Sequence, residues 1–126
     1  MQNQLEAAGV FLGRLLIAVL FLGGALQKTL DPAPASQLLL DFGLPAGLVW
    51  PALAFNALAG IALVLGVQVR LVALLAAGYC GFTSIFHYLP DDAWQMTIFV
   101  KNWAIAGGCL VLSVHGAGAW ALQPRR

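Results

Sequence analysis

The chain has 126 residues, of which 61% are hydrophobic and only 9% are charged, and its formal net charge is +1. Roughly a quarter of the residues of a soluble domain are charged, so this composition excludes a water-facing surface over the whole chain. No basic run points to nucleic acid as a partner. The apolar residues fall in blocks of the length that a bilayer core requires, which indicates a multi-pass membrane protein.

The first membrane helix is predicted over residues 5–26, with Arg14 inside it. A polar connector over residues 27–47 follows, and Pro32 and Pro34 end the helix because proline lacks the amide hydrogen and clashes with the preceding turn. Within the connector, residues 36–43 (SQLLLDFG) predict a short amphipathic helix at the membrane interface, with Ser36 as its N-cap.

Three further membrane helices are predicted over residues 48–65, 71–86 and 96–114. A tight turn at residues 66–70 joins the first two of these, and a polar loop at residues 89–95 precedes the last. Helices joined by short loops usually pack antiparallel to their neighbours. We therefore expect one all-α domain over residues 1–126, an antiparallel bundle of four transmembrane helices with a short interfacial helix between the first and the second.

The orientation of the bundle follows from its basic residues, which favour the cytoplasmic side of a membrane. With both termini inside, Arg14, Arg70, Arg125 and Arg126 lie on or toward the cytoplasmic side, and Lys28 and Lys101 lie toward the outer side. The majority predicts that both termini are cytoplasmic.

A few polar residues lie in or at the ends of the predicted helices, where a charge costs about 3 kcal/mol, so they are expected to face the bundle interior. Lys28 and His87 end their helices, and Lys101 lies in the second turn of the fourth helix. These positions share the outer end of the bundle. The candidate ligand-binding residues are Arg14, Lys28, Asn56, His87, Lys101 and Asn102. Arg14 lies deeper, but on the same helix face as Lys28, because 14 residues make close to four turns.

Two polar stripes extend this set into a predicted seam that opens outward. Cys80, Thr83, Ser84 and His87 follow i, i+3, i+4, i+7 spacing on one helix, and Asn102, Cys109 and Ser113 share a face of the next. The two cysteines are expected at different depths and therefore unpaired.

Each candidate also has a structural interpretation. Lys28 can snorkel to the headgroups, Asn56 and Asn102 can bridge helices by hydrogen bonds, and His87 can anchor the chain at the interface. Small residues such as Ala59, Gly60, Gly107 and Gly108 are expected to allow close helix packing. The sequence contains no catalytic triad, P-loop, dinucleotide fingerprint or zinc-ligand spacing, so it assigns no catalytic residue and no metal ligand.

Four segments in this order resemble the DoxX family of small bacterial membrane proteins: GRLLIAVLFLGGALQKTLDP, GIALVLGVQVRLVALLAA, FHY and FVKNWAIAGGCLVL. The resemblance covers residues 13–112, and the ordered set Arg14, Lys28, Gly60, Gly66, Arg70, His87, Lys101 and Asn102 is its most specific part. It implies a bacterial inner-membrane protein with four helices, often redox-associated. Family members commonly carry Glu where this chain has Asn56, so a proton-coupled role resting on that carboxylate is not carried over.

The resemblance and the polar seam together lead to three hypotheses. The first is a redox-associated subunit that binds a quinone-like or anionic small molecule. Such a subunit could be a non-catalytic part of an oxidoreductase complex. The second is a binding or transport protein for a small metabolite or lipid. The third is a structural membrane anchor. A quinone is the candidate cofactor, and the candidate partners are the lipid bilayer, a redox protein and further copies of the chain.

Overall fold

The computed structural model describes residues 3–124, and all its regular elements are helices. Four stretches are long and apolar enough to cross a membrane: Gln4–Leu30, Ala46–Leu65, Val69–His87 and Ala93–His115. The first is helix α1 (Gln4–Leu30), and the last is helix α5 (Ala93–His115). Helix α3 (Val49–Leu65) follows a 3-10 turn (Ala46–Leu48), and helix α4 (Val69–Ser84) continues into a second one (Ile85–His87). The prediction of an all-helical chain with four membrane-length helices is confirmed.

The helix ends differ from the predicted ones where side chains or prolines cap the backbone. Helix α1 continues to Leu30, one turn further than predicted, because only Asp31 and Pro32 stop it. Helix α5 begins at Ala93, since the carboxylate of Asp92 accepts hydrogen bonds from the amides of Trp94 and Gln95. Such an N-cap satisfies amides that have no partner within the helix.

Helix α2 (Ala33–Asp41) lies within the connector, where the sequence predicted a short helix. It begins earlier than predicted, with Pro32 at the N-cap position, and Ser36 lies inside it. The prediction of Ser36 as the cap was therefore wrong. Proline fits the start of a helix because the amide hydrogen that it lacks would have no acceptor there.

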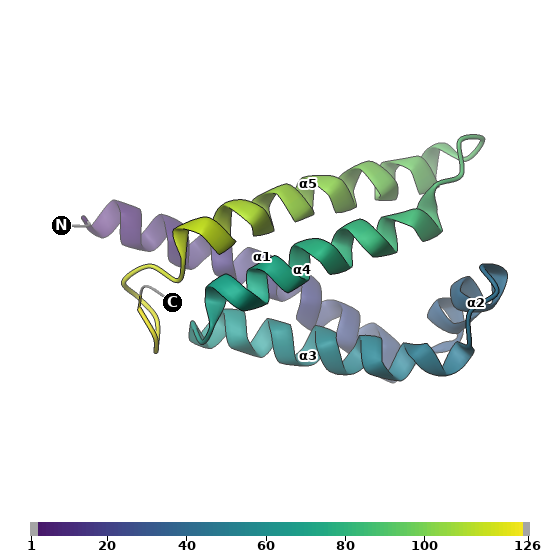
Figure 1. Ribbon diagram of the computed structural model, residues 1–126, viewed down its shortest axis with the longest axis horizontal. Coiled ribbons are helices and arrows are strands. Elements are labelled where there is room, and N and C mark those ends of the chain that lie inside the picture. The colour runs from purple at the N-terminus through teal and green to yellow at the C-terminus, as the bar shows by residue number, and fades with distance from the viewer. Residues whose placement is uncertain (1–2, 125–126) are drawn as a thin grey trace.

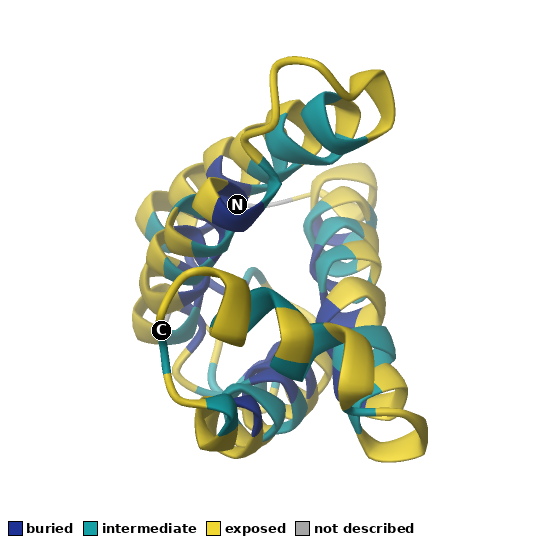
Figure 2. Cartoon of the chain, turned by 90° about the vertical axis from the view of Figure 1, so that its right-hand side faces the viewer, coloured by how far each residue is buried: buried dark blue, intermediate teal, exposed yellow. Residues whose placement is uncertain are grey.

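Helices α1 and α3 pack against each other, and so do α4 and α5. The start of α1, the segment after α5 and the α3–α4 turn lie at one end of the bundle, and α2 and the α4–α5 loop lie at the other (Figure 1). We call these the terminal end and the α2 end. Buried residues face the inside of the bundle, and most of the outward surface is exposed (Figure 2). Large apolar side chains such as Leu16, Val19 and Val111 make up much of that surface, as a lipid-facing protein requires.

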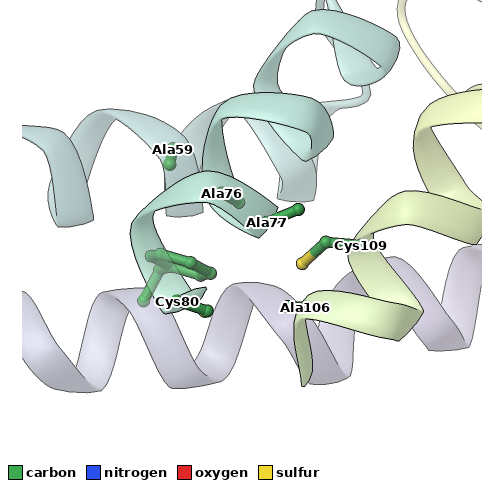
Figure 3. Close-up of a cluster of buried hydrophobic side chains, with 7 residues drawn as sticks. Ala59, Ala76, Ala77, Cys80, Ala106 and Cys109 are labelled. Atoms are coloured by element: carbon green, nitrogen blue, oxygen red, sulfur yellow. The ribbon is translucent and has the colours of Figure 1, made fainter. Parts of the chain in front are cut away.

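Small side chains make up most of the core between the helix pairs. One cluster consists of Phe21, Ala59, Ala76, Ala77, Cys80, Ala106 and Cys109 (Figure 3). A second, formed by Ala18, Leu63, Val69, Ala73, Leu112 and Ala117, includes a residue of the segment after α5. Small residues let helix backbones approach closely where lipid supplies no hydrophobic driving force. Ala59 and Gly60 are packed in this way, but a Cβ at Gly107 or Gly108 would meet no atom within 4 Å, so those two glycines do not mediate packing.

Candidate functional site

Arg14 is completely buried toward the terminal end, and its donors are bonded to backbone oxygens. Its Nε donates to the carbonyl of Leu63 at 3.1 Å and its Nη2 to Val64 at 3.3 Å, while Nη1 donates to Ala117 at 2.7 Å. Leu63 and Val64 lie in the last turn of α3, where carbonyls lack partners within the helix and a cation is favoured. Arg14 therefore ties α1 to the end of α3 and to the C-terminal segment.

The C-terminal segment is also bonded to the turn that follows α3. The amides of Leu122 and Gln123 donate to the carbonyls of Leu65 and Gly66 at 2.9 and 3.0 Å. Arg70 donates to the carbonyls of Val114 and His115. The two arginines thus close the terminal end of the bundle.

A cavity of about 730 Å³ lies toward the α2 end, lined by residues from α1 to α5 and the 3-10 turns. Five of the six predicted ligand residues line it: Lys28, Asn56, His87, Lys101 and Asn102. Arg14, the sixth, is not part of its lining. The remaining lining residues are mostly apolar, and no Asp or Glu is among those within the described part of the chain. Lys28 and Lys101 thus both line the cavity, and no carboxylate lines it beside them in the described part of the chain.

Lys28 and Asn56 meet at the inner wall of this cavity. The Nζ of Lys28 donates to the Oδ1 of Asn56 at 2.9 Å, and the side chain of Asn56 is only 3% exposed. The hydroxyl of Tyr79 lies 3.5 Å from the same oxygen. A Cβ at Gly24 would lie 3.1 Å from this oxygen, so the missing side chain gives it room. The sequence analysis missed Tyr79, although it directly precedes the polar stripe on α4.

His87 and Lys101 approach the cavity from the α4–α5 pair. The Nδ1 of His87 lies 2.7 Å from the Oε1 of Gln95, a contact that orients the imidazole ring. Sequence reasoning missed Gln95, which it placed in a loop and which lies in the first turn of α5. Lys101 is exposed, and Asn102 beside it is partly buried.

Part of each predicted polar stripe lines this cavity. The lining includes Cys80, Thr83 and His87 from one stripe and Asn102 from the other, but not Ser84, Cys109 or Ser113. Thr83 and Ser84 donate to carbonyls of their own helix, at Tyr79 and Gly81, and Ser113 donates to Leu110. Cys80 and Cys109 are free thiols, as predicted, and both belong to one buried cluster (Figure 3).

Comparison with known proteins places the chain in a family. A family model described as DoxX matches residues 9–89. The chain belongs to the DoxX family. It is 29% identical over 122 residues to the inner membrane protein YqjF of Escherichia coli strain K12, covering 96% of this chain and 94% of that protein. No solved structure matched.

DoxX membership and the four apolar helices support a multi-pass inner-membrane protein. The matched DoxX region contains Lys28, Asn56 and His87, whereas Lys101 and Asn102 lie beyond it. The similarity to YqjF extends over nearly the whole chain. No group of three or more His, Cys, Asp or Glu side chains within residues 3–124 could hold a metal ion.

Proposed function

We propose that this DoxX protein binds the oxygen-bearing head of a small amphiphile, quinone-like or anionic, in the cavity toward the α2 end. The observation that carries the proposal is the lining of that cavity. Its walls are mainly apolar, and Lys28, Asn56, His87, Lys101 and Asn102 converge on it without a carboxylate among the described lining residues. Ligand sites typically combine apolar walls with a few polar groups that fix orientation.

Lys28 and Lys101 would supply positive potential, and His87 and Asn102 would donate hydrogen bonds to a carbonyl or anionic oxygen. Lys28 already has one acceptor in Asn56, but an amide neutralises no charge, so the ammonium retains its attraction for an anion. We leave Arg14 out of the proposed ligand contacts, because backbone carbonyls already accept from its Nε, Nη1 and Nη2.

We further propose that the four helices cross the membrane in alternating directions, with both termini cytoplasmic and α2 lying at the outer interface. Two facts support this arrangement. The start of α1 and the described segment after α5 lie at the same end of the bundle (Figure 1). Arg70 lies at that end and Lys28 toward the other, and basic residues favour the cytoplasmic side. The cavity would then open toward the outer leaflet.

A redox-associated role rests on the resemblance to DoxX relatives. In such a role a partner protein would carry out the electron transfer. Binding of a metabolite or lipid without electron transfer is the second candidate function. The cavity lining favours this second function if the ligand is an anion, because two lysines line the cavity and no described lining residue is acidic. A purely structural anchor would require neither the cavity nor its lysines.

Binding of defined probes to the purified protein tests this proposal. A short-chain ubiquinone analogue and a single-chain carboxylate are titrated against wild type and against Lys28→Met and Lys101→Met. We expect at least one probe to bind to the wild type and to bind at least about tenfold more weakly to both variants, a loss of roughly 1.4 kcal/mol. If neither probe binds, or if both variants bind like the wild type, the cavity is not the site.

A further inference from the structure

A second, apolar cavity of about 430 Å³ lies between α1 and α5. Helix α1 contributes Leu16 and Leu20 to it, and α5 contributes Ala104 and Gly108 together with Lys101. These two helices make few contacts with each other, because α1 packs on α3 and α5 packs on α4. The groove therefore follows the boundary between the two helix pairs. We call it the α1–α5 groove.

The α1–α5 groove adjoins the main cavity, because Leu20 and Lys101 line both. Lys101 is thus the polar residue at the junction, with an apolar groove on one side and the Lys28–Asn56 pair on the other. The groove is open beside Gly108, where an added Cβ would meet no atom within 4 Å.

The charges at this junction favour a negative head group. Lys28 and Lys101 are lysines in membrane-length helices, and neither cavity has an Asp or Glu among its described lining residues. A cation held away from water is costly unless it is paired, and a bound anion would provide the pairing. A neutral carbonyl head would leave both lysines without a counter-charge.

We infer that the ligand is a single-chain anionic amphiphile, with a carboxylate or phosphate head at Lys28 and Lys101 and its apolar chain in the α1–α5 groove. This inference rests on the proposed function and specifies its ligand. One groove accommodates one chain, and the chain enters sideways from the bilayer because the groove lies on the surface between two membrane-length helices. Free fatty acids and single-chain phospholipids are the two sources of such a head and chain.

Photolabelling of the full-length protein in phosphatidylcholine vesicles tests this inference. The probe is palmitate with a diazirine near the chain end, and the competitors are palmitate, hexadecyl phosphate, hexadecanol, octanoate and a short-chain ubiquinone analogue. We expect labelling at the end of the α1–α5 groove away from Lys101, near Leu16 and Gly108. Palmitate or hexadecyl phosphate should compete at least about tenfold better than hexadecanol. The better of the two anions distinguishes a carboxylate source from a phosphate source.

Two neighbouring glycines provide a matched pair of variants for the chain. Gly107 and Gly108 are both exposed, and a Cβ at either meets nothing within 4 Å, but only Gly108 lines the groove. Gly108→Leu should fill the groove and abolish the advantage of palmitate over octanoate. Gly107→Leu should leave that advantage as in the wild type, and the melting temperatures of both variants show that they remain folded.

Four results would overturn the inference. Equal competition by hexadecanol and palmitate would exclude an anionic head, and equal behaviour of Gly107→Leu and Gly108→Leu would exclude the groove as the site of the chain. Binding of the ubiquinone analogue in the direct titration, without specific labelling by the palmitate probe, would reject the inference but leave the proposed cavity function intact. Absence of labelling together with absence of binding by either titrated probe would reject both.

Discussion

The Nζ of Lys28 on α1 donates a 2.9 Å hydrogen bond to the Oδ1 of Asn56 on α3. This bond joins two helices at a position where the asparagine side chain is almost fully buried. The amide accepts one of the three ammonium protons but neutralises no charge. The pair therefore links the helices and leaves a positive charge for a ligand.

Replacing Asn56 with Glu should convert this bond into an ion pair. We expect the variant to fold with a stability within about 1 kcal/mol of the wild type, because attraction and desolvation of a buried pair nearly cancel. Binding of an anionic probe should weaken by at least about tenfold, since the carboxylate occupies and neutralises Lys28. Thermal unfolding in detergent and probe titration measure the two effects. Asn56→Gln, which keeps the amide, is the control, and unchanged anion binding to Asn56→Glu would contradict the role of Lys28.

Lys101→Met should separate binding from stability. Methionine preserves chain length and removes a costly charge, so we expect the melting temperature to be unchanged or slightly higher while probe binding is lost. Lys101→Arg, which keeps the charge, should retain part of the binding. Asp92 is already used to cap α5 and is therefore a poor partner for this lysine. Lower stability with intact binding would assign Lys101 a structural role instead.

Arg14→Met should destabilise the bundle strongly but should not remove a contact with the ligand. Its removal leaves the carbonyls of Leu63, Val64 and Ala117 without their donor, and hydrogen bonds to charged groups contribute about 1.5 to 3 kcal/mol each. We expect a loss of at least about 3 kcal/mol of unfolding free energy in detergent titrations. Arg70→Met is the comparison: it removes two bonds at an exposed site and should cost about 1 kcal/mol. A stable Arg14→Met protein that has lost binding would place Arg14 in the ligand site after all.

Gly66→Ala should cost more stability than Gly43→Ala. Both glycines have a positive φ, 78° and 74°, which costs an alanine roughly 1 to 2 kcal/mol. A Cβ at Gly43 meets open space, whereas one at Gly66 overlaps Ala121 of the C-terminal segment. The difference between the two melting temperatures isolates the packing of that segment on the α3–α4 turn. Equal losses would show that the segment is not held there.

Both termini are predicted to be cytoplasmic. Met1, Arg125 and Arg126 lie outside the described residues, so reporter fusions at the two termini provide the test. Fusions at each end should report a cytoplasmic location, and a reporter inserted at Asp91 in the α4–α5 loop should report the periplasm. A periplasmic signal from either terminus would reverse the proposed orientation and place the cavity opening on the cytoplasmic side.

Hydropathy alone located the four membrane-length helices, because the requirement for a long apolar block is local and can be read along the chain. The predicted helix ends were less accurate where an N-cap residue determines the start of the helix. Asp92 caps α5 at an earlier start than predicted, and the N-cap of α2 is Pro32 rather than the predicted Ser36. The sequence also identified which polar residues need an explanation, since each one in an apolar block is costly.

The tertiary structure decided what those polar residues contact. Arg14 and Lys28 share a helix face, yet Arg14 meets the backbone at the end of α3 and Lys28 meets Asn56 beside the cavity. Tyr79, Gln95 and the α1–α5 groove emerged only once the helices were packed. The physical reason is that lipid tails are as apolar as leucine, so an apolar pattern does not reveal which helix faces meet protein and which meet the bilayer. Crossing and offset of helices determine those contacts, and neither is encoded in the hydropathy of any single helix.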